Sequence, residues 1–122
     1  MAREDTLTES RPTISTHVLD AARGVPAAGV RVRLHRIDGS GEARLVAEAT
    51  TDADGRIRSL GSAPLEVGCY RLELQLQPPG SPGAGGGFFE TVRLDLRIDD
   101  ATRSYHVPLL VAPYAVTAYR GS

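Results

Sequence analysis

The sequence predicts an all-β fold, a two-sheet antiparallel sandwich of about eight short strands. Apolar and polar residues alternate in many short segments, and this is the period of a half-buried strand. Clusters of Gly, Pro, Asp and Ser separate these segments and indicate turns. No long window of the sequence has the period of an amphipathic helix. The chain has 122 residues, 41% of them hydrophobic, so it is long enough for one domain with its own core.

The predicted elements follow in chain order. Residues 1–12 are polar and end in a proline, so we expect a flexible tail before a domain of residues 13–122. The turn Asp52-Ala53-Asp54-Gly55 combines Asp side chains that cap the backbone with a Gly suited to positive φ. Residues 78–87 are rich in Gly and Pro and are expected to form a loop. The expected strands are residues 13–20, 30–37, 43–51, 57–60, 69–77, 91–98, 104–111 and 114–120.

Alternation assigns each strand a core face and an outer face. Charged residues of the 91–98 strand, such as Arg93 and Asp95, lie on its outer face and suit cross-strand ion pairs. Cys69 is the single cysteine, so it cannot form an intrachain disulfide and is expected to be a small buried residue. The core-facing residues are expected to be Ile14, Thr16, Val18, Val30, Val32, Leu34, Tyr70, Leu72, Leu74, Leu76, Val92, Leu94, Leu96, Ile98, Tyr105, Val107 and Leu109.

Charge and composition exclude several classes of partner. The net charge is −1, which argues against a nucleic acid or an anionic membrane held by bulk charge. No apolar run has the length of a membrane span, and the first residues lack the apolar region of a secretory signal, so we expect a cytoplasmic protein. All 14 basic residues are arginine, which excludes a lysine nucleophile.

The histidines differ in their surroundings. His35 shares a face with arginines and is expected to be a solvated surface side chain. His17 and His106 lie opposite the apolar sets of their strands, and each taken singly would be an exposed histidine. Their faces are partly apolar, however, with Leu19 beside His17 and Leu110 beside His106. Such a face tends to be covered by another chain, and a histidine in that setting suits general acid–base catalysis because its pKa is near neutrality.

Other candidate chemistry is weaker. Two His and a carboxylate can bind a divalent ion, but Asp20 lies on the opposite face of the strand from His17, so we expect no metal. Arg56 directly follows a turn and is expected at a strand end. The final stretch, Tyr119-Arg120-Gly121-Ser122, brings a phenol, a guanidinium, a glycine and a hydroxyl together. Alone it is typical of a polar surface tail, and Ser122 lacks the Gly-x-Ser-x-Gly context of a nucleophilic serine.

Four stretches together resemble the 5-hydroxyisourate hydrolases, also called transthyretin-like proteins. They are ISTHVLDAARGVPAAGVRVRL near the start, TDADGR at 51–56, LEVGCYRLEL in the middle and YHVPLLVAPYAVTAYRGS at the end. The final YRGS is the most distinctive mark, because the hormone-carrying transthyretins share the fold and end differently. The chain departs from the family pattern at 78–87, where members usually carry a short helix, and at Phe88-Phe89-Glu90, which lacks a proline. A helix is therefore not expected there.

The resemblance implies an enzyme without cofactor or metal that hydrolyses 5-hydroxyisourate to 2-oxo-4-hydroxy-4-carboxy-5-ureidoimidazoline in urate (purine) degradation. It implies a homotetramer, a dimer of dimers, with active sites where the dimers meet. One alternative is a transthyretin-type carrier that binds a small aromatic ligand in the central channel without catalysis, and another is a silent interaction module. By resemblance the catalytic residues are His17, Arg56 and His106, and the substrate-binding residues are Tyr119, Arg120, Gly121 and Ser122.

Overall fold

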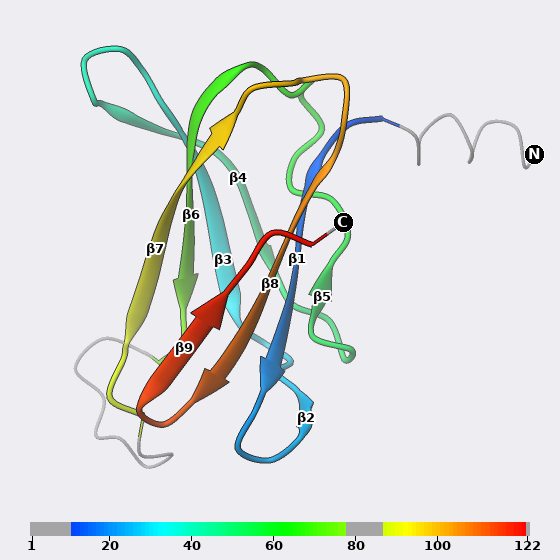
Figure 1. Cartoon of the computed structure of the whole chain (residues 1–122), viewed down its shortest axis with the longest axis vertical. Coiled ribbons are helices and arrows are strands. Elements are labelled where there is room, and N and C mark those ends of the chain that lie inside the picture. Colours follow the sequence, from blue (N-terminus) through cyan, green and yellow to red (C-terminus); the bar gives the residue numbers. More distant parts are fainter. Residues whose placement is uncertain (1–10, 78–86, 122) are drawn as a thin grey trace, which may run out of the picture.

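The computed structural model describes residues 11–77 and 87–121, which form a sandwich of two sheets. The sheets lie face to face, and the described residues contain no helix (Figure 1). The predicted all-β, two-sheet fold class is confirmed. No helix in these ranges has the length and apolar character needed to cross a membrane. Nearly all of the predicted loop 78–87 and most of the predicted tail 1–12 lie outside the described residues.

The first sheet carries the candidate site. Its strand order is β2-β1-β8-β9, and the short β5 also pairs with β1. Its strands are β1 (Ile14–Asp20), β2 (Val25–Pro26), β5 (Arg56–Ile57), β8 (Tyr105–Ala112) and β9 (Ala115–Ala118).

The second sheet has the order β4-β3-β6-β7, and all of its pairs are antiparallel. Its strands are β3 (Arg31–Ile37), β4 (Ala43–Thr50), β6 (Gly68–Gln75) and β7 (Thr91–Ile98).

The pair β1–β8 in the first sheet is parallel, from Ile14 opposite Tyr105 to Asp20 opposite Val111. The predicted antiparallel pairing holds for the other strand pairs of the described residues but not for this one. Hairpins force consecutive strands to be antiparallel. The chain passes through the whole second sheet between β1 and β8, so no hairpin sets their relative direction.

The core lies between the sheets and follows the alternation. Thr16 is the polar member of this set on β1, and its hydroxyl donates to the carbonyl of Val107 at 2.7 Å. This bond satisfies the hydroxyl, which would otherwise cost free energy when buried. The buried apolar residues are Ile14, Val18, Val32, Leu34, Ile57, Leu60, Tyr70, Leu72, Leu74, Ile98, Tyr105, Val107 and Leu109. The core faces predicted for β1, β3, β6 and β8 are confirmed.

Most element boundaries differ from the sequence prediction by one or two residues, and three differences are larger. The strand expected at 57–60 is only Arg56–Ile57, because just these residues pair with β1. The turn region after β1 contains the short strand β2, which pairs back onto Leu19 and Asp20. The strand expected at 114–120 ends at Ala118, and the chain then makes a separate bridge between Gly121 and His106.

Two side-chain predictions on the second sheet are wrong. Cys69 lies on the outer face of β6, opposite in direction to the buried Tyr70, and is only half-buried. His35 is also half-buried rather than solvated, and its Nδ1 is shielded from solvent without a hydrogen-bond partner in the described part of the chain. The pairing of β3 with β4 shifts register between Leu34 and His35. Such a bulge changes the direction of side chains and local packing in ways that strict alternation does not predict.

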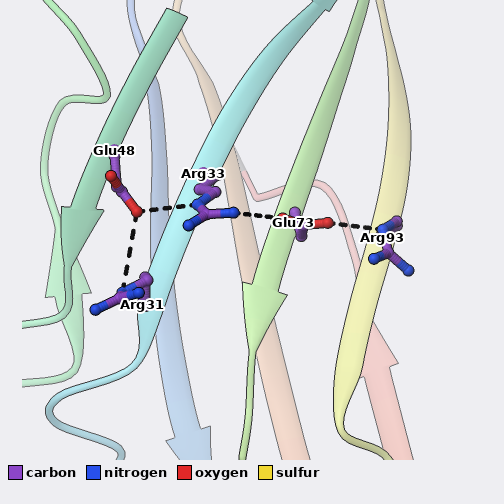
Figure 2. Close-up of polar contacts among 5 residues, drawn as sticks. All are labelled: Arg31, Arg33, Glu48, Glu73 and Arg93. Atoms are coloured by element: carbon purple, nitrogen blue, oxygen red, sulfur yellow. Dashed lines mark hydrogen bonds and ion pairs between the residues drawn. The ribbon is translucent and has the colours of Figure 1, made fainter. Parts of the chain in front are cut away.

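Ion pairs cover the outer face of the second sheet. Arg33 bonds Glu48 at 2.9 Å and lies 3.9 Å from Glu73, and Glu73 bonds Arg93 at 2.7 Å. Arg31 adds a longer contact to Glu48, so acidic and basic side chains alternate across four strands (Figure 2). The predicted cross-strand charge pairs are confirmed, including those of Arg93 and, at 2.7 Å to Arg71, of Asp95. This face is therefore strongly polar, unlike the outer face of the first sheet.

Candidate active site

His17 lies on the outer face of β1 because its neighbours Thr16 and Val18 point into the core. Its Nε2 atom is 3.0 Å from the backbone carbonyl oxygen of Asp54. A carbonyl can only accept a hydrogen bond, so Nε2 of His17 carries the proton. In the neutral imidazole the lone pair is then on Nδ1, which is the atom able to take up a proton.

The turn 52–55 fixes the position of this carbonyl and of Arg56. The Asp52 carboxylate accepts from the backbone N–H of Asp54 at 2.9 Å and of Arg56 at 3.0 Å. These bonds, above all that from Arg56, lower the pKa of Asp52 below its usual value. The turn is tied to β1 because the N–H of Val18 donates to the Gly55 carbonyl at 2.7 Å. In the β1–β5 pair, Arg56 is the direct partner of His17.

His106 lies on β8 as the direct partner of Ser15 in the parallel pair. Its Nδ1 atom is 2.8 Å from the Ser15 hydroxyl. Partial burial, followed by the positive charges of His17 and Arg56, lowers the pKa of His106 below its usual value. The strand pairing places the two imidazoles and the guanidinium on one outer face, and this environment disfavours the charged form of His106.

The last described residues run antiparallel to β8, and Gly121 forms a bridge with His106. The N–H of Gly121 donates to the His106 carbonyl at 2.7 Å, and the N–H of Tyr119 donates to the Pro108 carbonyl at 3.2 Å. A Cβ on Gly121 would lie 2.8 Å from Cδ2 of His106 and 3.4 Å from Cγ of Pro108. A residue with a Cβ at this position would have to displace the His106 ring, so glycine lets the backbone pack directly against the imidazole.

The side chains of the other candidate residues lie differently. Tyr119 is 55% exposed. The Arg120 guanidinium lies over the Tyr105 ring, 4.9 Å from its centroid, in a cation–π contact. Tyr105 belongs to the core face of β8, so Arg120 is not among the imidazoles in the single chain. Ser122 lies outside the described residues.

Sequence reasoning brought His17, Arg56, His106 and Gly121 to one place, but it missed Ser15 and Asp54. The available signal for Ser15 was its position two residues before His17, on the same face of the strand. Asp54 acts through its backbone carbonyl, which side-chain chemistry cannot reveal. Within the described ranges, no group of three or more His, Cys, Asp or Glu residues is arranged to hold a metal ion.

Fold and site together define a class, a transthyretin-like sandwich that carries two imidazoles and a guanidinium on the outer face of one sheet. The family model described as HIUase/Transthyretin family matches residues 14–121. The chain belongs to this family. A 5-hydroxyisourate hydrolase of Caulobacter vibrioides is 43% identical over 113 residues, which cover 89% of this chain and 97% of that protein.

Solved structures agree with this assignment. The structure of Klebsiella pneumoniae 5-hydroxyisourate hydrolase matches with a TM-score of 0.72 and 33% identity, over 91% of this chain and 99% of that one. Sea bream transthyretin in complex with thyroxine matches with a TM-score of 0.76 and 24% identity, over 88% of this chain and 93% of that one. At this identity the second match shows the shared fold alone.

Proposed function

We propose that the protein hydrolyses 5-hydroxyisourate, opening its ring at an amide bond to give 2-oxo-4-hydroxy-4-carboxy-5-ureidoimidazoline in urate degradation. The observation that carries the proposal is the meeting of His17, Arg56 and His106 on one outer face, with Gly121 packed on the His106 ring. The choice of substrate is supported by relatives that are named 5-hydroxyisourate hydrolase and align with this chain over most of its length.

The chemistry needs no cofactor. One imidazole takes a proton from water, and the resulting hydroxide adds to the ring carbonyl carbon. Arg56 donates to the developing oxyanion, because a guanidinium supplies a fixed positive fork. The tetrahedral intermediate then collapses, the carbon–nitrogen bond breaks, and the imidazolium returns its proton to the leaving nitrogen. Tyr119, Arg120 and Ser122 orient the ring.

Between the two histidines, His17 is the better base. The Asp54 carbonyl accepts from Nε2–H of His17 and holds the proton there. Nδ1 then has the lone pair that can accept a proton from water. The Ser15 hydroxyl can donate to or accept from His106, so this contact does not select one tautomer.

Assembly of the site uses further copies of the chain. Leu19 and Leu110 are neighbours on the outer face of the first sheet, and Leu110 is 37% exposed. An apolar outer face of this kind is stabilised when another chain covers it. A homotetramer, as a dimer of dimers, would enclose the imidazoles between subunits and bring further copies of Tyr119 and Arg120 to them. A cytoplasmic location stays a prediction from the sequence.

The alternative function is a carrier, since sea bream transthyretin was solved with thyroxine in the same fold. A carrier of an aromatic ligand has no need of a partly buried imidazole beside a second imidazole and a guanidinium, which lower its pKa. This electrostatic arrangement favours the enzyme.

The decisive experiment generates 5-hydroxyisourate in place with urate oxidase and follows its ultraviolet decay with and without the protein. We expect the wild type to accelerate the decay, and His17→Ala and His106→Ala to lose about 10²–10⁴-fold in rate while staying folded. The matched control is His35→Ala, the histidine on the second sheet, which should retain the rate. A wild-type protein that leaves the decay unchanged would exclude the hydrolase and leave the carrier and the interaction module.

A further inference from the structure

We infer that Ser15 is a positioning residue, whose hydroxyl fixes the His106 ring and lets it change protonation state without moving. The inference rests on the proposed function, because it concerns the imidazoles of that site. It starts from one contact, the 2.8 Å distance between the Ser15 hydroxyl and Nδ1 of His106.

The contact is built into the sheet. Ser15 and His106 are 91 residues apart in sequence, yet the parallel register of β1 and β8 sets them directly opposite each other. Both side chains lie on the outer face, since their flanking residues are buried. Two direct cross-strand partners are close enough for a short hydroxyl to reach a ring nitrogen without strain.

The His106 ring is in contact on both sides of its attachment point, at Nδ1 and at Cδ2. The Ser15 hydroxyl lies at Nδ1, and the Gly121 backbone packs so closely at Cδ2 that an added Cβ would come within 2.8 Å. Nδ1 and Cδ2 flank the attachment point of the imidazole, so the opposite edge, with Nε2, is directed away from the strand. Nε2 is therefore the atom of His106 that meets substrate or water.

A hydroxyl is the partner that this role needs. It donates to Nδ1 when the neutral ring carries its proton on Nε2, and by rotating it accepts from Nδ1–H when the ring is protonated. A backbone carbonyl, the partner of Nε2 in His17, only accepts and holds one tautomer. Ser15 thus keeps the His106 ring in one position in both its neutral and its protonated form, with Nε2 directed toward the substrate.

If Ser15 were an ordinary surface serine, neither of the two results described below would be expected. The test compares Ser15→Thr with Ser15→Val, which have nearly the same shape, both suit a strand, and differ in the hydroxyl. We expect Ser15→Thr to keep kcat within about twofold, and Ser15→Val to lose about three- to tenfold in kcat, the value of one ordinary hydrogen bond, with little change in KM. Circular dichroism confirms folding, and Ser15→Ala provides a smaller variant should Val at this position unfold the chain.

The second readout is the titration of the His106 ring, followed by NMR without substrate. His17 on β1 and Arg56 on β5 are the charged groups that act on His106, and both variants retain them. Hydrogen bonds to an ionised group are roughly twice as strong as neutral ones, so the loss of the hydroxyl penalises the imidazolium. The midpoint of His106 should be lower in Ser15→Val than in Ser15→Thr, while that of His35 stays constant.

The outcomes separate the two proposals. Equal kcat and equal His106 midpoints in the two variants would overturn the positioning role of Ser15. A wild-type protein that is inactive on 5-hydroxyisourate would overturn the proposed function, and the NMR titration would then decide the role of Ser15 alone. A low kcat in Ser15→Val with the expected midpoint shift supports both.

Discussion

Replacement of Gly55 by alanine tests how the turn 52–55 positions the site. Gly55 is buried and has a φ of 75°, a conformation that costs a residue with a Cβ about 1–2 kcal/mol. Its added Cβ would also collide with the backbone carbonyl of Val18 and lie 3.1 Å from the N atom of Ala27. Backbone atoms cannot move aside as a flexible side chain can, so the turn itself must shift.

The matched control is Gly24→Ala. Gly24 has nearly the same φ, 72°, but nothing lies within 4 Å of its added Cβ. Both variants have the same conformational cost, and both restrict the unfolded chain equally. The difference between them therefore measures the collision at Gly55, including loss of the 2.7 Å bond from Val18 N–H to the Gly55 carbonyl.

We expect Gly24→Ala to destabilise the fold by about 1 kcal/mol and Gly55→Ala by about 2–4 kcal/mol, since a buried backbone group left without its hydrogen bond adds about 1–3 kcal/mol. For a domain of this size each kcal/mol lowers Tm by about 4 °C. Thermal unfolding followed by circular dichroism measures the difference. Activity, measured well below both Tm values, should fall in Gly55→Ala because Arg56 and the Asp54 carbonyl move. Equal Tm values and equal activities in the two variants would refute this account of the turn.

Three further predictions follow from the contacts. Gly121→Ala places a Cβ 2.8 Å from Cδ2 of His106, so the ultraviolet assay should show a loss of about tenfold or more, with a small change in Tm. Burial and nearby positive charge lower the pKa of His106, so its contribution to stability is complete above about pH 6.5 and is lost as the pH falls through the folded pKa. Arg56→Met should raise the His106 midpoint measured by NMR, and an unchanged midpoint would contradict the electrostatic argument. Glu73→Gln removes the carboxylate between Arg33 and Arg93, so Tm should fall more at low salt than at high salt, with activity retained.

Local pattern was sufficient to predict which side chains face the core. The side-chain period of a strand is a property of a few consecutive residues, so Ile14, Thr16 and Val18 could be assigned to one face without knowledge of their partners. The same reasoning correctly put His17 and His106 on outer faces. For His35 the predicted outer face is consistent with the buried Leu34 beside it, but the expected solvation was wrong. The register of β3 against β4 shifts there at a bulge that depends on the neighbouring strand.

Contacts within the candidate site were harder to predict from the sequence. Gly121 and Arg56 came from the resemblance to a family, and their roles remain predictions. The partners that hold the imidazoles, the Ser15 hydroxyl and the Asp54 carbonyl, have no signature of their own in the sequence. A serine on a strand and a carbonyl in a turn are too common to identify a site unless their neighbours in space are known.

The sequence by itself determined the all-β class, the turn at 52–55 and the faces of the strands, because alternation and turn chemistry act over a few residues. The tertiary structure alone decided that β1 and β8 pair in parallel, and hence that Ser15 meets His106 across 91 residues of sequence. The reason is physical: the direction and register of two distant strands depend on how both sheets pack around a shared core, and no short stretch of either strand contains that information.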